Sequence, residues 1–383
     1  MSDTRKTTKP NVPNLRFPGF EGEWARCTLG EIGEPYIGLT YSPADVVSEG
    51  GTIVFRSSNI QNGEIDYSDI VRVNKIIKDS IITRKDDLLI CARNGSPRLI
   101  GKNALLKEAD EGQTFGAFML VFRSNDNHFV HQLLCTKGYN SQVSENLGAR
   151  INQITTSNIR DFEFCFPQST AERNKIAGFL DLIDERIAVQ SRLIEDLKKL
   201  RCAVSNKLFQ SVKGVVIPLS GISNIVKGKQ INGDFLAEVG EYYVMNGGTE
   251  PSGYYDNYNV EANTISISEG GNSCGYVQFN RMPFWSGGHC YTIQDIVSDV
   301  ETLYLYHYLK SKEDSIMKLR IGTGLPNIQK KDLAEFKVII PAIEQQRTIS
   351  NILSLLERKT EIEGRMLISM RTEKQYLLHQ MFI

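Results

Sequence analysis

Two stretches of the chain, PQSTAERNKIAGFLDLIDERI (residues 167–187) and PAIEQQRTISNILSLLERKTE (residues 341–361), share one pattern. Each begins with a proline and a few polar residues, after which apolar residues follow three and four positions apart. Proline ends a preceding strand, and polar or acidic residues are typical of a helix N-terminus. The sequence therefore predicts two helices that repeat each other.

The apolar spacing continues far beyond these stretches, over about five heptads in each copy. The predicted seam residues of the first helix are Ile176, Leu180, Ile183, Ile187, Ile194, Leu197, Arg201, Val204 and Leu208. Those of the second helix are Ile349, Leu353, Leu356, Leu367, Met370, Lys374, Leu377 and Met381. Because ordinary globular helices average about eleven or twelve residues, this length favours a coiled coil over two core helices.

Charged residues within the seam indicate the direction of pairing. An antiparallel arrangement places Arg201 near Glu357 and Lys374 near Asp184. A parallel arrangement would instead stack Arg201 on Lys374, and like charges in a seam oppose pairing. The sequence thus predicts an antiparallel coiled coil within one chain.

The segments around the helices are also duplicated. GARINQITTSNIRDFEFCFP (148–167) aligns with GTGLPNIQKKDLAEFKVIIP (322–341), and EWARCTLGEIGEPYIG (23–38) more weakly resembles VVIPLSGISNIVKGKQ (215–230), while the intervening segments differ. Repeats of this kind indicate one architecture used twice. We expect a disordered arm over 1–13, a globular domain over 14–166, a helix over 167–212, a second domain over 213–340 and a second helix over 341–383.

The predicted fold class of both domains is α/β (α+β), in a pseudo-two-fold tandem repeat. Short β-rich runs, separated by Gly, Asn, Asp and Ser, predict strands. These runs are TIVFRS, DLLICA, AFMLVF, TISIS and FKVII. One helix is expected over 128–146 and its counterpart over 301–319.

Composition narrows the functional classes. The hydrophobic content of 41% and charged content of 23% are ordinary for a globular protein, and the net charge of −1 argues against indiscriminate coating of nucleic acid. No apolar run reaches the length of a membrane span, and the polar start has no apolar signal core, so we expect a cytoplasmic protein. Seven scattered cysteines fit reduced thiols. His128, His131 and Cys135 could form a metal cluster, but no second ligand pair accompanies them, and we predict no metal site.

Several loops combine Gly, Asn, Arg and aromatic residues. Arg hydrogen-bonds guanine, Asn hydrogen-bonds adenine, and small residues let a loop enter a groove closely. The candidate DNA-binding residues are Arg56, Ser57, Ser58, Asn59, Arg93, Asn94, Ser96, Arg98, Lys102, Asn246, Thr249, Tyr254, Asn272, Ser273 and His289. Carbohydrate-binding loops and plain turns share this composition, so composition alone leaves these alternatives open.

Catalytic motifs are missing from the sequence. It contains no phosphate-binding G-x-x-x-x-G-K-[ST] loop, no G-x-S-x-G elbow and no Asn/Asp-Pro-Pro-aromatic signature of an adenine methyltransferase. The trio Asp332, Glu335 and Lys337 faintly resembles a nuclease set, but Glu163 stands at the Lys337 position of the first copy. We therefore predict a chain that is not an enzyme by itself and holds no cofactor.

The combination of these segments resembles the specificity subunit of type I restriction–modification systems. The resemblance rests on LRFPGFEGEW (15–24) with LGE (29–31), on IRDFEFCFP followed by AERNKIAGFLDLID, and on LAEFKVIIP followed by EQQRTISNILSLLE. The first copy departs from the pattern, with Ala171-Glu172-Arg173 where the second has Glu344-Gln345-Gln346. The resemblance covers nearly the whole chain.

This resemblance implies two target recognition domains, each reading one half of a bipartite asymmetric DNA target in host defence against foreign DNA. It also implies that the helices set the spacing and dock two methyltransferase (modification) subunits, with two restriction subunits in the full complex and no membrane. S-adenosylmethionine, ATP and Mg²⁺ would reside on those partners. The alternative is a coiled-coil scaffold with two domains that bind protein or glycan and do not retain DNA.

Overall fold

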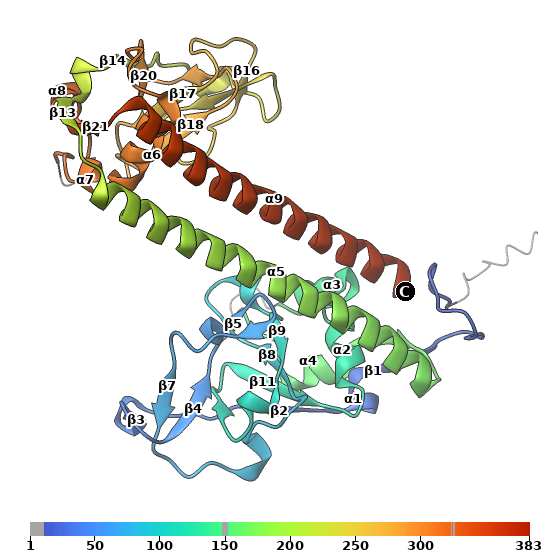
Figure 1. The fold of residues 1–383 in the computed structure, drawn as a ribbon. Coiled ribbons are helices and arrows are strands. Elements are labelled where there is room, and N and C mark those ends of the chain that lie inside the picture. Colours follow the sequence, from blue (N-terminus) through green and yellow to red (C-terminus); the bar gives the residue numbers. More distant parts are fainter. Residues whose placement is uncertain (1–10, 148–151, 323, 325) are drawn as a thin grey trace, which may run out of the picture. The chain divides into compact units, whose positions relative to one another are not determined.

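The computed structural model describes residues 11–147, 152–322, 324 and 326–383 (Figure 1). The chain forms two compact units: unit 1 is Met1–Ser191 with Arg365–Ile383, and unit 2 is Arg192–Gly364. Of the predicted arm, residues 1–10 lie outside the described residues. The prediction is wrong for residues 11–13, because Pro13 is buried and the carbonyl of Asn11 accepts a hydrogen bond of 2.8 Å from the Trp24 N–H.

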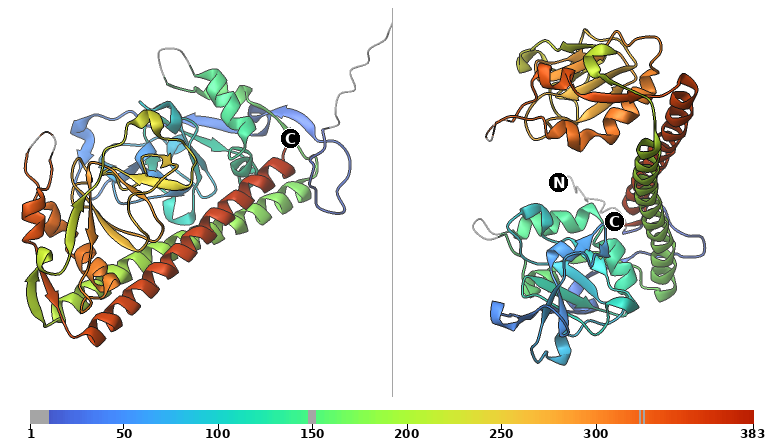
Figure 2. Two further views of the ribbon diagram at one scale, coloured as in Figure 1. Left: turned by 90° about the horizontal axis from the view of Figure 1, so that it is seen from above. Right: turned by 60° about the vertical axis from the view of Figure 1, so that its left-hand side comes forward.

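The two predicted long helices are α5 (Thr170–Ser211) and α9 (Ile343–Met381). In unit 1 the start of α5 shares a core with the end of α9, where Ile176 and Leu180 cluster with Leu378 and Met381. In unit 2 the end of α5 clusters with Ile349 and Leu353 at the start of α9. The helices therefore run antiparallel within each unit, which confirms the predicted direction, and Figure 2 shows them side by side.

The seam separates buried from exposed apolar residues. Every predicted seam residue of α5 and α9 is buried or half-buried. Other apolar residues of the two helices face solvent, for example Leu182, which is 65% exposed, and Leu355, which is 67% exposed. The two apolar stripes pack against each other, so each long helix buries its apolar side. An isolated helix in water has no such partner.

Besides its parts of α5 and α9, the described residues of unit 1 form four sheets and four short helices. The strands, in the spatial order of each sheet, are β1 (Ala25–Thr28) with β12 (Glu163–Phe166); β2 (Glu34–Ile37), β11 (Met119–Arg123), β8 (Leu88–Cys91) and β9 (Asn103–Leu105); β10 (Thr114–Phe115), β4 (Thr52–Phe55), β7 (Val71–Val73) and β3 (Val46–Val47); and β5 (Ile60–Gln61) with β6 (Glu64–Ile65). The helices are α1 (Leu29–Ile32), α2 (Asn127–Leu133), α3 (Lys137–Asn146) and α4 (Thr156–Asp161). Short 3-10 turns η1 (Pro43–Asp45), η2 (Ser57–Asn59), η3 (Asp79–Ile81), η4 (Pro97–Leu99) and η5 (Glu108–Asp110) join them.

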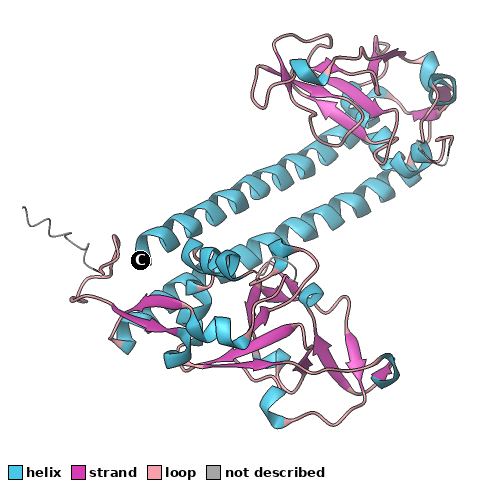
Figure 3. Cartoon of the chain, turned by 180° about the vertical axis from the view of Figure 1, so that it is seen from behind, coloured by secondary structure: helices cyan, strands magenta, loops and turns pink. Residues whose placement is uncertain are grey.

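Unit 2 repeats this order. Its strands are β13 (Val215–Pro218) with β21 (Lys337–Ile340); β14 (Asn224–Lys227), β20 (Cys290–Gln294), β17 (Thr264–Ser268) and β18 (Val277–Asn280); and β16 (Tyr254–Tyr255), β15 (Tyr242–Met245) and β19 (Trp285–Ser286). The helical elements are η6 (Leu219–Gly221), η7 (Gly233–Phe235), α6 (Thr302–Ser311), α7 (Glu313–Met317) and α8 (Lys330–Ala334). Figure 3 shows that the strands lie in the globular parts of the chain.

The antiparallel sheet β2-β11-β8-β9 forms the centre of unit 1, and both of its faces are buried. Leu88 and Ile90 of β8 point into the core shared with α2, α5 and α9, while Leu89 and Cys91 point into a second core shared with β4 and β10. A strand buried on both faces reads as a continuous apolar run, as DLLICA does. The sheet β14-β20-β17-β18 has the same strand order in unit 2 and confirms the predicted tandem repeat.

The prediction of one continuous helix over 128–146 is wrong. Two helices, α2 and α3, occupy this range, because the Thr136 side chain accepts the Tyr139 N–H and starts a new helix. Its counterpart over 301–319 is likewise divided into α6 and α7. A threonine cap satisfies a free N–H at a helix start and so competes with continuation of the preceding helix.

A polar network links α2 to both long helices in unit 1. Lys374 of α9 donates to Asp184 of α5 at 2.5 Å, and the Gln132 amide of α2 donates to both Asp184 and Asp181 at 2.8 Å. The equivalent pair in unit 2 is Arg201 with Glu357, at 3.1 Å. Both predicted ion pairs of the seam therefore form.

Reversing the charge of Asp184 tests the seam pair. Asp184→Lys places a second ammonium beside the largely buried Lys374, so we expect unit 1 to lose about 2 kcal/mol, between the values typical of exposed and of buried pairs. Adding Lys374→Asp restores opposite charges and should recover much of the loss. Denaturant unfolding followed by Trp24 fluorescence in a Trp285→Phe background measures this change.

The matched control is Glu185→Lys, which reverses a charge at the neighbouring exposed position of α5. It should leave the free energy of unfolding nearly unchanged. A double variant as unstable as Asp184→Lys alone would contradict the pairing.

His128 makes the stability of unit 1 depend on pH. Its hydrogen bond of 2.5 Å to Asp181, with the nearby Asp86, raises the His128 pKa above its usual value. The stability from protonated His128 is therefore fully present below the unfolded pKa of about 6.5 and is lost as pH rises through the folded pKa. We expect the stability advantage of the wild-type chain over His128→Gln to shrink between pH 6 and pH 9, measured by denaturant unfolding.

The neighbouring His131 does not confound this comparison. Burial lowers the His131 pKa to about 4, so this residue opposes folding in acid, but it is present in both chains. An advantage that stays constant or grows with pH would show that the carboxylates do not stabilise the charged imidazole.

Candidate nucleic-acid interface

The loop that follows β8 in unit 1 is held by two other segments. The backbone N–H groups of Ala92 and Arg93 both donate to the carbonyl of Phe118, at 2.9 and 3.0 Å. The carbonyl of Ala92 in turn accepts from the N–H of Ile154 at 2.9 Å. Three segments that are distant in sequence thus converge at the end of the central strand, where small shifts of one loop would disturb the others.

Side chains lock the same loop further along. The Asn94 amide nitrogen donates to the Ser57 hydroxyl at 2.9 Å, and its amide oxygen accepts from the Ser96 N–H at 3.0 Å. The structure therefore brings together Ser57, Arg93, Asn94 and Ser96 from the predicted set. Arg93 is exposed, and its guanidinium lies 4.9 Å from the centroid of the Phe118 ring.

Two predicted residues of this region have structural partners. Asn59 is only 1% exposed, and its amide donates to the carbonyls of Asp66 and Asp69 while its oxygen accepts from the Arg56 N–H. The turn therefore engages both ends of the Asn59 amide, and DNA binding by Asn59 stays a prediction. Arg56 pairs with Asp69 at 2.8 Å.

The remaining candidates of unit 1 lie on the same loops. Ser58 is exposed within η2, beside Ser57, and Arg98 is exposed within η4. Lys102 is half-buried, and its carbonyl accepts from the Cys91 N–H at 2.8 Å. Arg98 and Lys102 thus extend the surface of the Arg93 loop with positive charge.

Unit 2 contains the equivalent junction at the end of β17. The N–H of Glu269 donates to the carbonyl of His289 at 2.9 Å, and the N–H of Ile328 donates to the carbonyl of Glu269 at 2.8 Å. The Asn246 side chain accepts from the His289 N–H at 3.2 Å. Two predicted residues, Asn246 and His289, therefore meet here.

A buried carboxylate distinguishes the junction of unit 2. One oxygen of Glu269 accepts from Lys227 at 2.6 Å and from the Tyr291 hydroxyl at 2.9 Å, and His289 Nδ1 lies 3.8 Å from the other oxygen. Burial, together with the hydrogen bond to Glu269, raises the Tyr291 pKa, so this hydroxyl stays a donor. Glu269 was not among the predicted residues.

Four other predicted residues of unit 2 lie at different distances from this junction. Asn272 is exposed and Ser273 half-buried in the turn after β17, where the Tyr276 N–H donates to the Ser273 carbonyl. Thr249 is exposed between β15 and β16. Tyr254 pairs with Tyr243 near the start of β15, whereas Asn246 follows the end of that strand, so the structure does not bring Tyr254 to the junction.

Matching hydrogen bonds define which positions of the two repeats correspond. Ala92 and Glu269 occupy one equivalent position, Arg93 and Gly270 the next, and Phe118 and His289 a third. Isolated bridges pair Arg93 with Gln153 and Gly270 with Asn327. The alignment of Ile154 with Ile328 could have revealed Gln153 and Asn327 as a matched amide pair, while no sequence signal marked Phe118.

One glycine in each repeat is required by a close approach of two backbones. A Cβ at Gly38 would lie 2.2 Å from the carbonyl oxygen of Gly116, and a Cβ at Gly228 would lie 2.2 Å from that of Gly287. Contacts below 3 Å to backbone do not occur for real side chains, so both positions exclude any larger residue. These crossings place the segments that carry Phe118 and His289.

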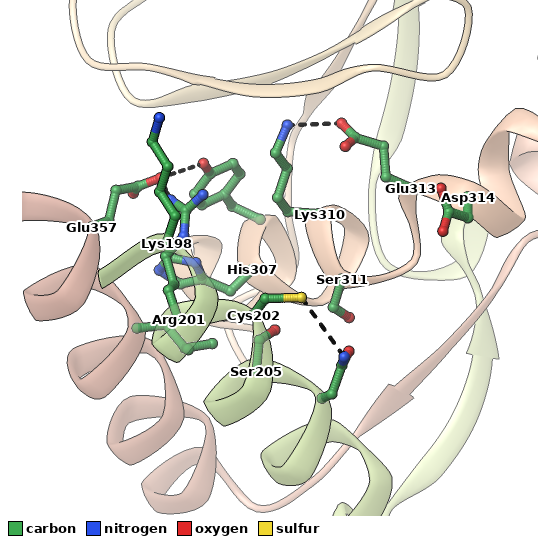
Figure 4. Close-up of a pocket in the computed structure, with 13 residues that line it drawn as sticks. Lys198, Arg201, Cys202, Ser205, His307, Lys310, Ser311, Glu313, Asp314 and Glu357 are labelled. Atoms are coloured by element: carbon green, nitrogen blue, oxygen red, sulfur yellow. Dashed lines mark hydrogen bonds and ion pairs between the residues drawn. The ribbon is translucent and has the colours of Figure 1, made fainter. Parts of the chain in front are cut away.

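Unit 2 also contains a cleft of about 330 Å³ between α5, α6 and α9 (Figure 4). Two ion pairs form within the cleft: Arg201 with Glu357, and Lys310 with Glu313 at 2.8 Å. Lys310 also lies 3.9 Å from the centroid of the Tyr276 ring. This pairing makes the cleft part of the junction between the helices and the globular domain.

The residues described, 11–147, 152–322, 324 and 326–383, contain no group of three or more His, Cys, Asp or Glu side chains placed to bind a metal ion. His128, the first member of the cluster considered from the sequence, instead contacts Asp181 and Asp86. None of the helices in the described part of the chain has the length and apolar character that crossing a bilayer requires.

Two segments of the chain, residues 21–199 and 212–369, match the family model of the type I restriction modification DNA specificity domain. The chain belongs to this family. The two matches fall on the two repeats, so each carries one specificity domain with the same junction at the end of its central strand.

Curated relatives of this family align with parts of the chain. A putative type I specificity subunit of Mycoplasma genitalium is 25% identical over 61% of this chain and 65% of its own length. A putative specificity subunit of Mycoplasma pneumoniae is 31% identical over 43% of this chain and 44% of its own length. The EcoKI specificity subunit of Escherichia coli is 29% identical over 47% and 41%, respectively. The alignments thus span less than two thirds of these relatives.

Solved structures share the fold of the specificity domains. The S subunit of the type I restriction–modification system from M. genitalium matches with a TM-score of 0.70 and 23% identity over 97% of this chain and 99% of that chain. A chain from a study of complex assembly and conformational transition of the type I system matches with a TM-score of 0.53 and 16% identity, over 95% and 97%.

Proposed function

We propose that this chain is the sequence-specific DNA-recognition subunit of a type I restriction–modification complex. In this proposal each specificity domain reads one half of a bipartite, asymmetric target. The observation that carries it is the pair of equivalent loop junctions, which share one backbone frame and present different side chains. A frame used twice with different contents suits two different half-targets.

The side chains at the junctions suit base recognition. Unit 1 presents Arg93 over Phe118, and unit 2 presents His289 beside Glu269. Guanidinium, amide, imidazole and carboxylate groups are the donors and acceptors that distinguish base pairs in the major groove. The net charge of −1 means that other subunits supply much of the neutralisation of phosphates, while this chain supplies contacts to bases.

The outer faces of the long helices suit docking of partner subunits. Leu182 and Val189 of α5, and Leu355 and Ile362 of α9, are exposed apolar residues opposite the seam. An apolar stripe on a helix surface is a typical site for another helix. We assign these faces to two methyltransferase subunits, with two restriction subunits joining the full complex.

Catalysis in this proposal belongs to the partners. The methyltransferase subunits would hold S-adenosylmethionine and methylate adenine after flipping it from the duplex, and the restriction subunits would use ATP and Mg²⁺. The chain itself then acts without a cofactor, in the cytoplasm, where the DNA is.

Mapping of methylated adenines tests the proposal directly. The chain is expressed with the methyltransferase subunit of its complex in a host that lacks type I systems, and the host genome is sequenced for methylation. We expect one bipartite motif with two unlike halves, which vanishes when the gene for this chain is deleted. The vector with the methyltransferase subunit alone serves as the control.

An unchanged methylome would contradict the proposal. Together with no retention of this chain on DNA in the presence of the methyltransferase subunit, it would favour a scaffold that binds protein or glycan.

A further inference from the structure

We infer that Arg93, supported by the ring of Phe118, is a base-reading residue of unit 1 and selects a guanine in its half-site. This inference rests on the proposed function and makes it specific to one residue. Other polar side chains of the junction already have partners within unit 1, whereas the guanidinium of Arg93 is free to contact DNA.

Arg93 is an exposed arginine of this junction, and its charge is free to act. Within residues 11–147, 152–322, 324 and 326–383, no carboxylate forms an ion pair with it, whereas Arg56 pairs with Asp69 and Arg123 pairs with Asp87. Arg93 is also exposed, while Arg123 is mostly covered. A ligand with acceptor atoms would therefore meet the Arg93 guanidinium without displacing another partner.

Phe118 holds this guanidinium in place. The ring is 57% exposed, and the guanidinium carbon lies 4.9 Å from its centroid. A guanidinium over a ring is attracted through its face, which leaves the N–H groups at its edge available. The two backbone hydrogen bonds from Ala92 and Arg93 to the Phe118 carbonyl hold the segment that carries the ring against the segment that carries the arginine.

Asn94, the neighbouring candidate, is a positioning residue instead. Its nitrogen donates to Ser57 of η2 and its oxygen accepts from the Ser96 N–H, so both ends of its amide have partners within unit 1. Reading adenine requires both ends of such an amide at once. The loop thus fixes its backbone through Asn94 and presents Arg93.

The geometry of the free Arg93 guanidinium indicates which ligand it binds. A planar fork of N–H donors pairs with two acceptors side by side, and in the major groove guanine offers these at O6 and N7. Phosphate offers acceptors as well, but the ring limits the guanidinium to one direction, which suits a base edge better than a mobile backbone contact.

Unit 2 lacks this device. The positions equivalent to Arg93 and Phe118 hold Gly270 and His289. Changes at Arg93 should therefore affect one half of the bipartite motif and leave the other half intact. This expectation separates base reading from a general effect on folding or on assembly, which would weaken methylation at the whole motif.

The test is the methylome of host cells that express the complex with Arg93→Ala, Arg93→Lys or Phe118→Ala. We expect Arg93→Ala and Arg93→Lys to relax one guanine position in one half-site by about tenfold or more, because lysine keeps the charge but loses the fork. Phe118→Ala should relax the same position less strongly. Arg26→Ala, which removes an exposed arginine on β1, is the matched control and should preserve the motif.

In vitro binding to the wild-type motif separates the alternatives. A phosphate contact predicts that Arg93→Ala weakens binding to all sequences and lowers the salt slope by about one, and that Arg93→Lys restores binding. That result, an unchanged motif in Arg93→Lys, or relaxation at a position other than a guanine would overturn the inference. A wild-type complex that yields no motif would instead refute the proposed function.

Discussion

The burial of one apolar stripe against another is the constraint on which the rest of this structure depends. Each long helix carries an apolar seam, and the globular domain of its own repeat covers only part of it. The end of each helix therefore packs into the core of the other repeat and completes that core. Phe382 shows this most clearly. The centroid of its ring lies 5.2 Å from that of Phe129 and 6.3 Å from that of Trp24, although these residues stand far apart in the sequence. The ion pair between the half-buried Asp184 and the largely buried Lys374 then fixes the register, a use for which polar seam residues are well suited.

The central sheets explain how one frame can hold two different sets of loops. In both repeats one face of the sheet packs against the helices with apolar residues, such as Ile90 in β8 and Ile267 in β17. The opposite face differs, since Leu89 of β8 enters an apolar core whereas Ser266 of β17 accepts a hydrogen bond of 2.9 Å from Asn280. The face toward the helices is thus held constant, and the face toward the loops can vary without disturbing the helix pair.

Much of the frame was predictable from the sequence, because it rests on periodicity and on repeated spacing. The alternation of three and four residues indicated the seam, and the charges of Arg201 and Lys374 indicated its direction. The loops were less predictable, because their composition does not say which hydrogen bonds close the turn. Asn59 is rich in donors and acceptors like a recognition residue, yet the backbone of its own turn uses them. Phe118 begins a buried apolar run but faces solvent, and only the meeting of β8 with β11 places it under Arg93.

The most direct measurement of the central claim is hydrogen–deuterium exchange on the chain truncated after Gly364. If the end of α9 completes unit 1, the amides of α2 and of the first part of α5 should exchange faster than in the full chain, while those of β17 and β20 in unit 2 keep their protection. Full protection of α2 in the truncated chain would contradict the account, because unit 1 would then stand without the helix of the other repeat.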